Sequence, residues 1–215
     1  MQIITHPLYF APIPLYAQLY ASQGILVDTD SPFVKQTFRN RAIIATENGK
    51  QALTIPVVHN YLQKMRDVRI SEHGNWRHVH WNAIQSAYRK SPFFDYYADD
   101  FAHFYEERDG FLLDFNMRLH NVVCQLLGLE RDIAILEKKE ENDYSDLRWM
   151  ASVQELEKEY YSKSMPYYQV FSQRNGFIPN LSIVDLLFNM GPEGLLVLRD
   201  TEKSFLNTPS TNSVY

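Results

Sequence analysis

The opening of the chain contains the pattern that most restricts its possible folds. A short run of β-branched residues, Ile3–Thr5, leads into a proline-rich loop from His6 to Pro14, and apolar residues at helical spacing follow from Leu15. A second apolar run, Ile25–Val27, then reads as a buried strand. The order strand, helix, strand predicts a βαβ unit, whose strands lie parallel and whose crossover is right-handed.

Polar residues follow both of these predicted strands. His6 and Tyr9 come after the first strand, and Asp28 comes after the second. In open α/β sheets, ligands bind at the carboxyl ends of the parallel strands. We therefore expect these side chains to lie beside a substrate or an anion.

A predicted β-hairpin, Lys35 to Val58, carries many hydrogen-bond donors at its start. Two apolar runs flank an Asn48-Gly49 dipeptide, and both of these residue types tolerate the positive φ of a tight turn. Its first strand carries three cations and one amide, namely Lys35, Arg39, Asn40 and Arg41. Such groups suit a carboxylate or phosphate, but cations also discourage pairing at an edge strand. Composition alone favours the edge strand.

The fold class expected is α/β, in one domain of residues 1–200. A Rossmann-like βαβ unit and the hairpin would form a mainly parallel or mixed sheet, followed by a largely helical C-terminal half. The predicted helices cover residues 76–90, 92–108, 112–127 and 183–190, and a further strand covers 132–137. We expect the charge run 138–146 to be a solvated loop and residues 201–215 to be a loosely ordered tail.

Composition restricts the partners and the compartment. The 215 residues have a formal net charge of -5, which argues against sequence-independent binding to nucleic acid. Cys124 is the single cysteine, so the chain can form no internal disulfide and a reducing compartment fits. We find neither a signal peptide nor an apolar run of transmembrane length, and we expect a cytoplasmic protein. The abundant aromatic side chains could form a core or a homodimer interface.

No familiar catalytic motif settles the chemistry. The sequence lacks a glycine-rich phosphate loop and the HExxH, CxxC and G-x-S-x-G motifs, so it predicts no metal site and leaves the cofactor unknown. His80 lies on a predicted apolar helix face, where it is either a packing histidine or, beside a carboxylate, an acid or base. Asp185 lies near a helix start, where a favourable interaction with the helix dipole alone could explain it. Asn180, which precedes that helix, could simply be its cap.

Motif-like blocks recur along nearly the whole chain. They are His6-Pro7-x-Tyr9, Lys35 to Arg41, Asn48-Gly49 with Leu53 to Val57, Trp76-x-x-x-His80-Trp81, Tyr88-x-x-Ser91-Pro92-Phe93-Phe94, Leu112 to Asn116, and Phe177 to Asn189. In this order they resemble the WbqC-like family of bacterial proteins. Many members have Gln-Pro where this chain has His6-Pro7.

The resemblance implies a role in bacterial surface-polysaccharide and O-antigen biosynthesis, on nucleotide-linked or lipid-linked sugars. It singles out polar positions that match the motifs of the family: Lys35, Arg39, Asn40, Arg41, His80, Asn116, Asn180, Ser182, Asp185 and Asn189. One hypothesis is a transferase for acyl, aminoacyl or nucleotidyl groups. The other is a non-catalytic ligand-binding or assembly protein of the same pathway.

In the transferase hypothesis, the cations of the hairpin hold a phosphate or carboxylate of a small-molecule ligand. His80 is the base, and Asp185 or Asp28 orients it. Asn40 and Asn180 position the acceptor. Ser182, His6 and Tyr9 complete the expected contacts with the substrate.

Overall fold

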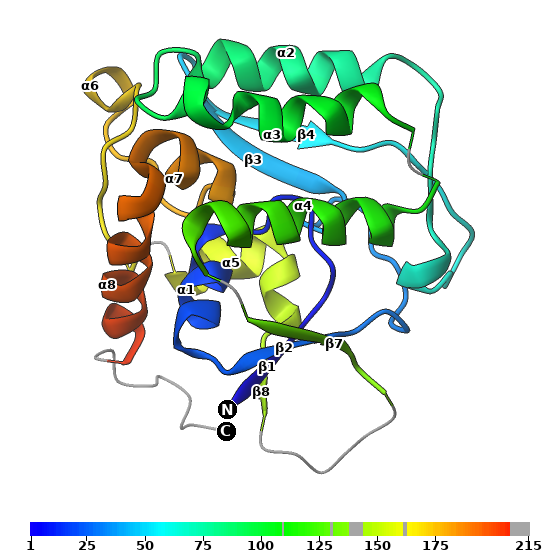
Figure 1. Cartoon of the computed structure of the whole chain (residues 1–215). Helices are drawn as coiled ribbons and strands as arrows, with labels where there is room; N and C mark the ends of the chain where they lie inside the picture. Colours follow the sequence, from blue (N-terminus) through cyan, green and yellow to red (C-terminus); the bar gives the residue numbers. More distant parts are fainter. Residues whose placement is uncertain (109, 130, 138–143, 161–162, 207–215) are drawn as a thin grey trace.

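Figure 1 shows the computed structural model of the chain, which describes residues 1–108, 110–129, 131–137, 144–160 and 163–206. A parallel sheet of four strands lies at one end of the molecule, in the order β7-β2-β1-β8. Its strands are β1 (Gln2–Thr5), β2 (Gly24–Val27), β7 (Asp132–Ile135) and β8 (Tyr144–Asp146). The predicted α/β class and the largely helical C-terminal half are confirmed.

The βαβ unit is present as predicted. Helix α1 (Ile13–Ala21) connects β1 to β2, and Ile3 lies opposite Ile25 in parallel register. Proline suits the first turn of α1 because its ring fixes a helical φ and its missing N–H would have had no partner there. The Ser22 hydroxyl donates to the Leu19 carbonyl at 3.0 Å and closes the helix before β2.

The two outer strands, β7 and β8, depend on backbone contacts that cannot be predicted from a local sequence pattern. Residues 144–146 were expected within a solvated loop, but they form β8, in which Ser145 lies opposite Ile3. This prediction was wrong because main-chain pairing with β1 stabilises a segment without an apolar pattern; residues 138–143 lie outside the described part. On the other edge, a Cβ at Gly24 would lie 2.7 Å from the Asp132 carbonyl oxygen of β7.

The hairpin forms a separate sheet of two antiparallel strands, β3 (Arg41–Thr46) and β4 (Gly49–Thr54), and does not join the parallel sheet. Its loop is Glu47-Asn48, one residue earlier than expected, and Gly49 has the positive φ of 97°. Residues 35–40 form turns before β3, so Lys35, Arg39 and Asn40 do not lie on a strand as predicted. A second small sheet pairs β5 (Val57–Val58) with β6 (Arg69–Ile70).

Helices make up most of the remaining chain. They are α2 (Trp76–Tyr88), α3 (Phe94–Glu106), α4 (Leu112–Leu127), α5 (Val153–Tyr160), α6 (Ser172–Asn175), α7 (Ile183–Met190) and α8 (Gly194–Leu206), with short 3-10 turns η1 (Met65–Asp67), η2 (Arg148–Ala151) and η3 (Gly191–Glu193). Helix α8 continues past Thr201, where we expected a loose tail, and the Thr201 side chain is fully buried. Residues 207–215 lie outside the described part.

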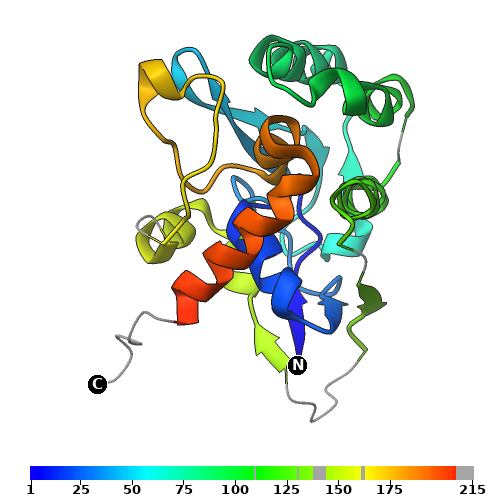
Figure 2. The ribbon, with the colours of Figure 1, turned by 60° about the vertical axis from the view of Figure 1, so that its left-hand side comes forward.

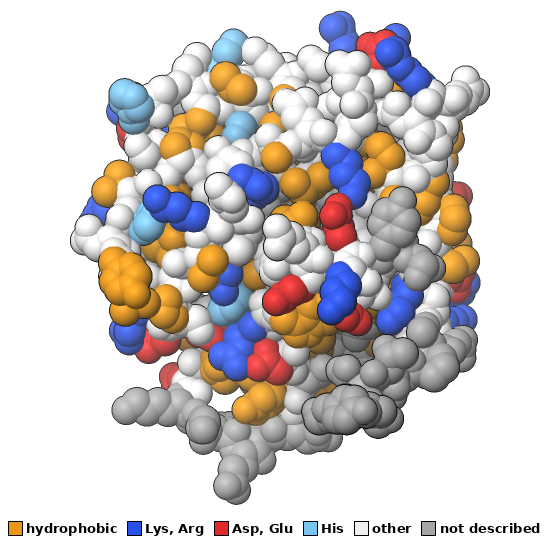
Figure 3. Space-filling view, turned by 180° about the vertical axis from the view of Figure 1, so that it is seen from behind, with side chains coloured by type: hydrophobic (Ala, Val, Ile, Leu, Met, Phe, Trp, Pro, Cys, Tyr) orange, Lys and Arg blue, Asp and Glu red, His pale blue; other side chains and the backbone are white. Residues whose placement is uncertain are grey.

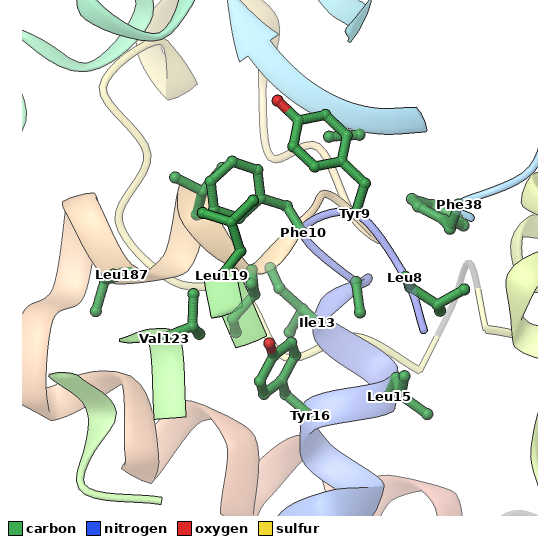
Figure 4. Close-up of a cluster of buried hydrophobic side chains, with 14 of the residues drawn as sticks. Leu8, Tyr9, Phe10, Ile13, Leu15, Tyr16, Phe38, Leu119, Val123 and Leu187 are labelled. Atoms are coloured by element: carbon green, nitrogen blue, oxygen red, sulfur yellow. The ribbon is translucent and has the colours of Figure 1, made fainter. Parts of the chain in front are cut away.

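The helices pack in layers around the loop that follows β1. Helices α2 and α3 lie side by side over the hairpin, and α4 lies between them and the parallel sheet (Figure 1). Helix α8 packs along α1 (Figure 2). Side chains of the loop and α1, such as Tyr9 and Ile13, meet Leu119 and Val123 of α4 and Leu187 of α7 in one apolar cluster (Figure 4). The loop after β1 therefore runs through the core.

The charge on the surface and the length of the helices agree with what the composition predicts. On the face seen in Figure 3, Lys and Arg side chains are interspersed with Asp and Glu. Among the helices of the described ranges, none is long and apolar enough to cross a membrane.

Candidate functional site

Charged and polar side chains gather at the carboxyl ends of the parallel strands. They are His6 after β1, Asp28 after β2, Arg148 after β8, Arg39 from the turns before the hairpin, and Asn116 from α4; we call them the strand-end group. Arg148 Nη1 donates to Asp28 Oδ2 at 2.7 Å, and the Ser31 hydroxyl donates to the same oxygen at 2.6 Å. Burial disfavours the ionised form of Asp28, but these hydrogen bonds outweigh burial and lower its pKa to about 2.

His6 is held as a neutral imidazole. Its Nδ1 lies 3.4 Å from the Asp28 carbonyl oxygen, and a carbonyl can only accept, so Nδ1 carries the hydrogen. Nε2 is then left as the acceptor of the ring. Burial and, after it, the charge of Arg39 lower the pKa of His6 to about 4. His6 can therefore accept a hydrogen bond from a substrate but is a weak base near neutral pH.

Arg39 is the buried cation of the group, with 7% of its surface exposed. Burial lowers its pKa to about 10, although the charge of Asp28 acts in the opposite direction, and the guanidinium stays charged near neutral pH. Its Nη1 donates to the Thr37 hydroxyl at 3.3 Å, whereas its buried Nε has no hydrogen-bond partner among the described residues. A buried guanidinium N–H of this kind is a donor for an anionic oxygen.

Asn116 joins the loop after β1 to the turn that carries Arg39. Its Nδ2 donates to the Pro7 carbonyl at 3.1 Å and to the Arg39 carbonyl at 2.8 Å. Its Oδ1 is buried without a partner in the described part of the chain. With His6, Asn116 lines a cavity of about 20 Å³ between α1, α4 and the sheet, which has room for about one water molecule.

His80 and Tyr9 form a second cluster. The Tyr9 hydroxyl lies 3.0 Å from His80 Nδ1 and 2.8 Å from the Tyr105 hydroxyl. Burial lowers the pKa of His80 to about 4. We expected Asp185 or Asp28 to orient His80, but its side-chain partner is Tyr9, because the loop after β1 passes beneath α2.

Asp185 lies in a third cluster that ties α7 to α2. Its carboxylate accepts from the Tyr88 hydroxyl at 2.8 Å, from the Tyr167 hydroxyl at 2.6 Å and from Gln169 Nε2 at 3.3 Å. Burial raises the pKa of Asp185 to about 6, against the effect of these hydrogen bonds. The fully buried carboxylate holds packed elements together at this position.

The other predicted residues mostly bond to the protein itself, although Asn40 Oδ1 and Asn180 Nδ2 are buried without a partner among the described residues. Asn40 Nδ2 donates to the Ile55 carbonyl at 2.9 Å, and the Ser182 hydroxyl accepts from the Ile43 amide at 2.9 Å. Asn180 Oδ1 accepts from the Ser164 hydroxyl, and Arg41 Nε donates to the Thr54 hydroxyl. Lys35 is exposed. Of the residues predicted for the site, His6, Asp28 and Arg39 lie together at the carboxyl ends of the parallel strands.

Arg148 is the residue that the sequence did not reveal. It follows β8, and β8 has no apolar pattern from which to predict a strand end. Asn116 stood only among the positions suggested by the family resemblance. In the ranges that the structure describes, no group of three or more His, Cys, Asp or Glu side chains could hold a metal ion.

Comparison with known proteins identifies relatives but no reaction. A model described as the WbqC-like protein family matches residues 7–166 and 154–196. The chain is 29% identical over 208 residues to the Uncharacterized protein Rv1507c of Mycobacterium tuberculosis, a match that covers 84% of this chain and 89% of that protein. No solved structure matches significantly.

Proposed function

Because the chain belongs to the WbqC-like protein family, we propose that it is a cytoplasmic transferase for nucleotide-linked or lipid-linked sugar precursors of bacterial surface polysaccharide such as O-antigen. The family resemblance suggests the pathway. The proposed reaction rests on one observation: Arg39, Arg148 and His6 lie close together at the carboxyl ends of the parallel strands. Ligands bind at that edge of α/β sheets.

The strand-end group suits a phosphate-bearing substrate. Arg39 has a buried N–H without a partner among the described residues, and Arg148, whose side chain is 37% exposed, is paired with Asp28 and Asp146 and would turn part of its guanidinium to the phosphate. Guanidinium groups bind phosphate oxygens through charge-assisted hydrogen bonds, which are about twice as strong as neutral ones. The phosphoryl group of the substrate would lie between these two arginines, and Asp28 would hold Arg148 in place.

His6 would position the acceptor. Its Nε2 can accept a hydrogen bond from an acceptor hydroxyl or amine, because Nδ1 is directed at the Asp28 carbonyl. The many relatives with glutamine at this position would keep such an acceptor without a titratable base. His80 would act as a positioning residue, since its bond to Tyr9 fixes the loop that carries His6.

A turnover assay tests this proposal. The protein is incubated with pooled nucleotide sugars and acyl, aminoacyl or nucleotidyl donors, and products are followed by mass spectrometry. Arg39→Met and Arg148→Met should each lower product formation at least about tenfold, as expected when a charge-assisted bond to phosphate is removed. Arg199→Met, whose native side chain pairs with Asp200 on α8, is the matched control. Equal turnover by all variants would rule out the strand-end group as the site.

The alternative is a non-catalytic ligand-binding or assembly protein of the same pathway. It is favoured by the separation of His80 from Asp185, which leaves the expected base without its carboxylate. Thermal shift with sugar nucleotides distinguishes the two functions. Stabilisation that depends on Arg39, without turnover, would favour binding alone. Light scattering at high concentration tests the possible homodimer.

A further inference from the structure

A groove at the N-terminus of α2 shares no lining residue with the strand-end group. It has a volume of about 340 Å³, and its walls include Glu72, Trp76, Arg77, Trp81, Tyr105 and Arg108. These side chains come from the loop before α2, from α2 itself and from the end of α3. The groove thus combines aromatic rings with Arg77 at the start of α2, Arg108 after the end of α3, and the two carboxylates of Glu72 and Glu106.

The start of α2 favours an anion. The first backbone N–H groups of a helix have no intrahelical partner, and the helix dipole makes this end positive. Asn75 occupies the N-cap position but makes no capping side-chain hydrogen bond within the described chain, and the first turn contains no acidic residue. Oxyanions bind at helix N-termini for these reasons.

Buried donors beside this helix start point to a ligand independently. Trp76 Nε1, Arg77 Nε and Arg77 Nη2 are buried and lack a partner among the described residues, although the side chains are only 7% and 9% exposed. The guanidinium carbon of Arg77 lies 4.5 Å from the centre of the Trp76 ring, a cation–π contact. All three atoms can only donate, so the matching ligand group is an acceptor.

Glu72 shows which acceptor suits the groove. Both of its carboxylate oxygens accept from Arg77 Nη1, at 3.0 and 2.8 Å, and one lies 3.8 Å from Arg108 Nε. The Glu72 side chain is 43% exposed and Arg108 is 82% exposed, so both lie at the rim. An oxyanion from solution could bind beside this carboxylate or displace it.

The aromatic wall supplies apolar ring edges next to the donors. Trp81 stacks with Tyr105, with ring centres 5.6 Å apart and planes inclined by 21°, and also with Phe94, with ring centres 6.2 Å apart. The Tyr105 hydroxyl also bonds to Tyr9, the partner of His80. A ring in the groove would therefore contact the same cluster that holds the loop after β1.

We propose that this groove binds an oxyanion carried on a flat ring, with the phosphate or carboxylate at the start of α2 against Trp76 and Arg77, and the ring against Trp81 and Tyr105. Donors without an acceptor and an uncapped helix start determine the anionic end. The stacked rings determine the other end. This site would exist whether or not the strand-end group is catalytic.

Nuclear magnetic resonance of protein with nitrogen-labelled tryptophan tests the site directly. The probes are phenyl phosphate, inorganic phosphate and benzoate, at constant ionic strength. The Trp76 indole signal, assigned by its loss in Trp76→Phe, should shift saturably with phenyl phosphate as Nε1 gains an acceptor. Inorganic phosphate should bind about tenfold more weakly because it lacks the ring. Comparison with benzoate separates phosphate from carboxylate as the preferred group.

Variants examined by calorimetry complete the test. Trp76→Phe and Arg77→Met should each weaken phenyl phosphate about tenfold, and Arg108→Ala should weaken it less because that side chain is exposed. Arg199→Met, whose native side chain pairs with Asp200 on α8 outside both sites, should bind like wild type. If Arg77→Met does not fold, Trp76→Phe and Arg108→Ala suffice. An unmoved Trp76 signal, equal affinity of Trp76→Phe and wild type, or an equal loss of affinity in Arg199→Met would each overturn the proposal.

Discussion

Mild acid should destabilise the protein mainly through the buried His6 and His80 and the half-buried His120. Burial is the largest cause that lowers the pKa of His6, His80 and His120, in each case from 6.5 to about 4. Because the folded-state pKa lies below the unfolded value, the unfolded chain takes up these protons first. The stability that the neutral imidazoles contribute is present above pH 6.5 and is lost as the pH falls through about 4.

The size of the effect follows from the same values. At about pH 5, the difference in proton binding removes about 2 kcal/mol of folding free energy per histidine, or about 6 kcal/mol in total. Asp185 acts in the opposite direction, because its pKa is raised from 3.8 to about 6 and the folded state takes up its proton first. Its protonation adds about 1 kcal/mol. The net loss between about pH 7.5 and pH 5 is then about 5 kcal/mol.

Urea unfolding followed by circular dichroism at both pH values measures this loss. In His120→Gln the loss should be smaller by about 2 kcal/mol. The comparison is made within each protein, so any pH-independent destabilisation by the substitution cancels. A wild-type loss below about 1 kcal/mol, or an undiminished loss in His120→Gln, would refute the assignment of the acid sensitivity to these imidazoles.

Three substitutions test the packing, each by thermal or urea unfolding. Gly24→Ala should cost about 2 kcal/mol because its Cβ would lie 2.7 Å from the Asp132 carbonyl oxygen, and a neutral effect would contradict the close strand approach. Tyr9→Phe should cost about 1–3 kcal/mol by leaving its two buried partners unpaired, whereas Tyr61→Phe, at a side chain 91% exposed, should change little. Ser182→Ala should cost about 1–2 kcal/mol, since a hairpin amide loses its acceptor; stability equal to wild type would show that the amide finds another.

Elements with a local signal were predictable from the sequence. The apolar run of Ile25–Val27 and the spacing of apolar residues in α4 determine their structure almost alone, because each buries one continuous face. Gly128 ends α4 in the left-handed conformation, as its position after the last apolar residue indicates. Such features depend on neighbours within a few residues.

Features that depend on distant contacts were not predictable. Strand β8 exists because it pairs with β1, more than a hundred residues earlier in the chain. Arg148 reaches Asp28 for the same reason. For Asp185, a predicted ligand contact, tertiary packing supplies partners from Tyr88 and Tyr167. For Asn40 it supplies the Ile55 carbonyl to Nδ2 and leaves Oδ1 without a partner among the described residues. A polar residue type alone does not distinguish a ligand contact from a satisfied buried group.

The loop after β1 also has a consequence for how the chain is made. Its backbone pairs with a segment near the other end of the sequence: the Ile13 amide donates to the Leu181 carbonyl at 3.0 Å, and the Ile183 amide donates to the Ala11 carbonyl at 2.9 Å. The Ile13 amide and the Ala11 carbonyl therefore have no hydrogen-bond partner until translation has passed residue 183. A nascent chain released earlier would expose the segment that carries His6 and Tyr9, so the strand-end group should assemble only after residue 183 has left the ribosome.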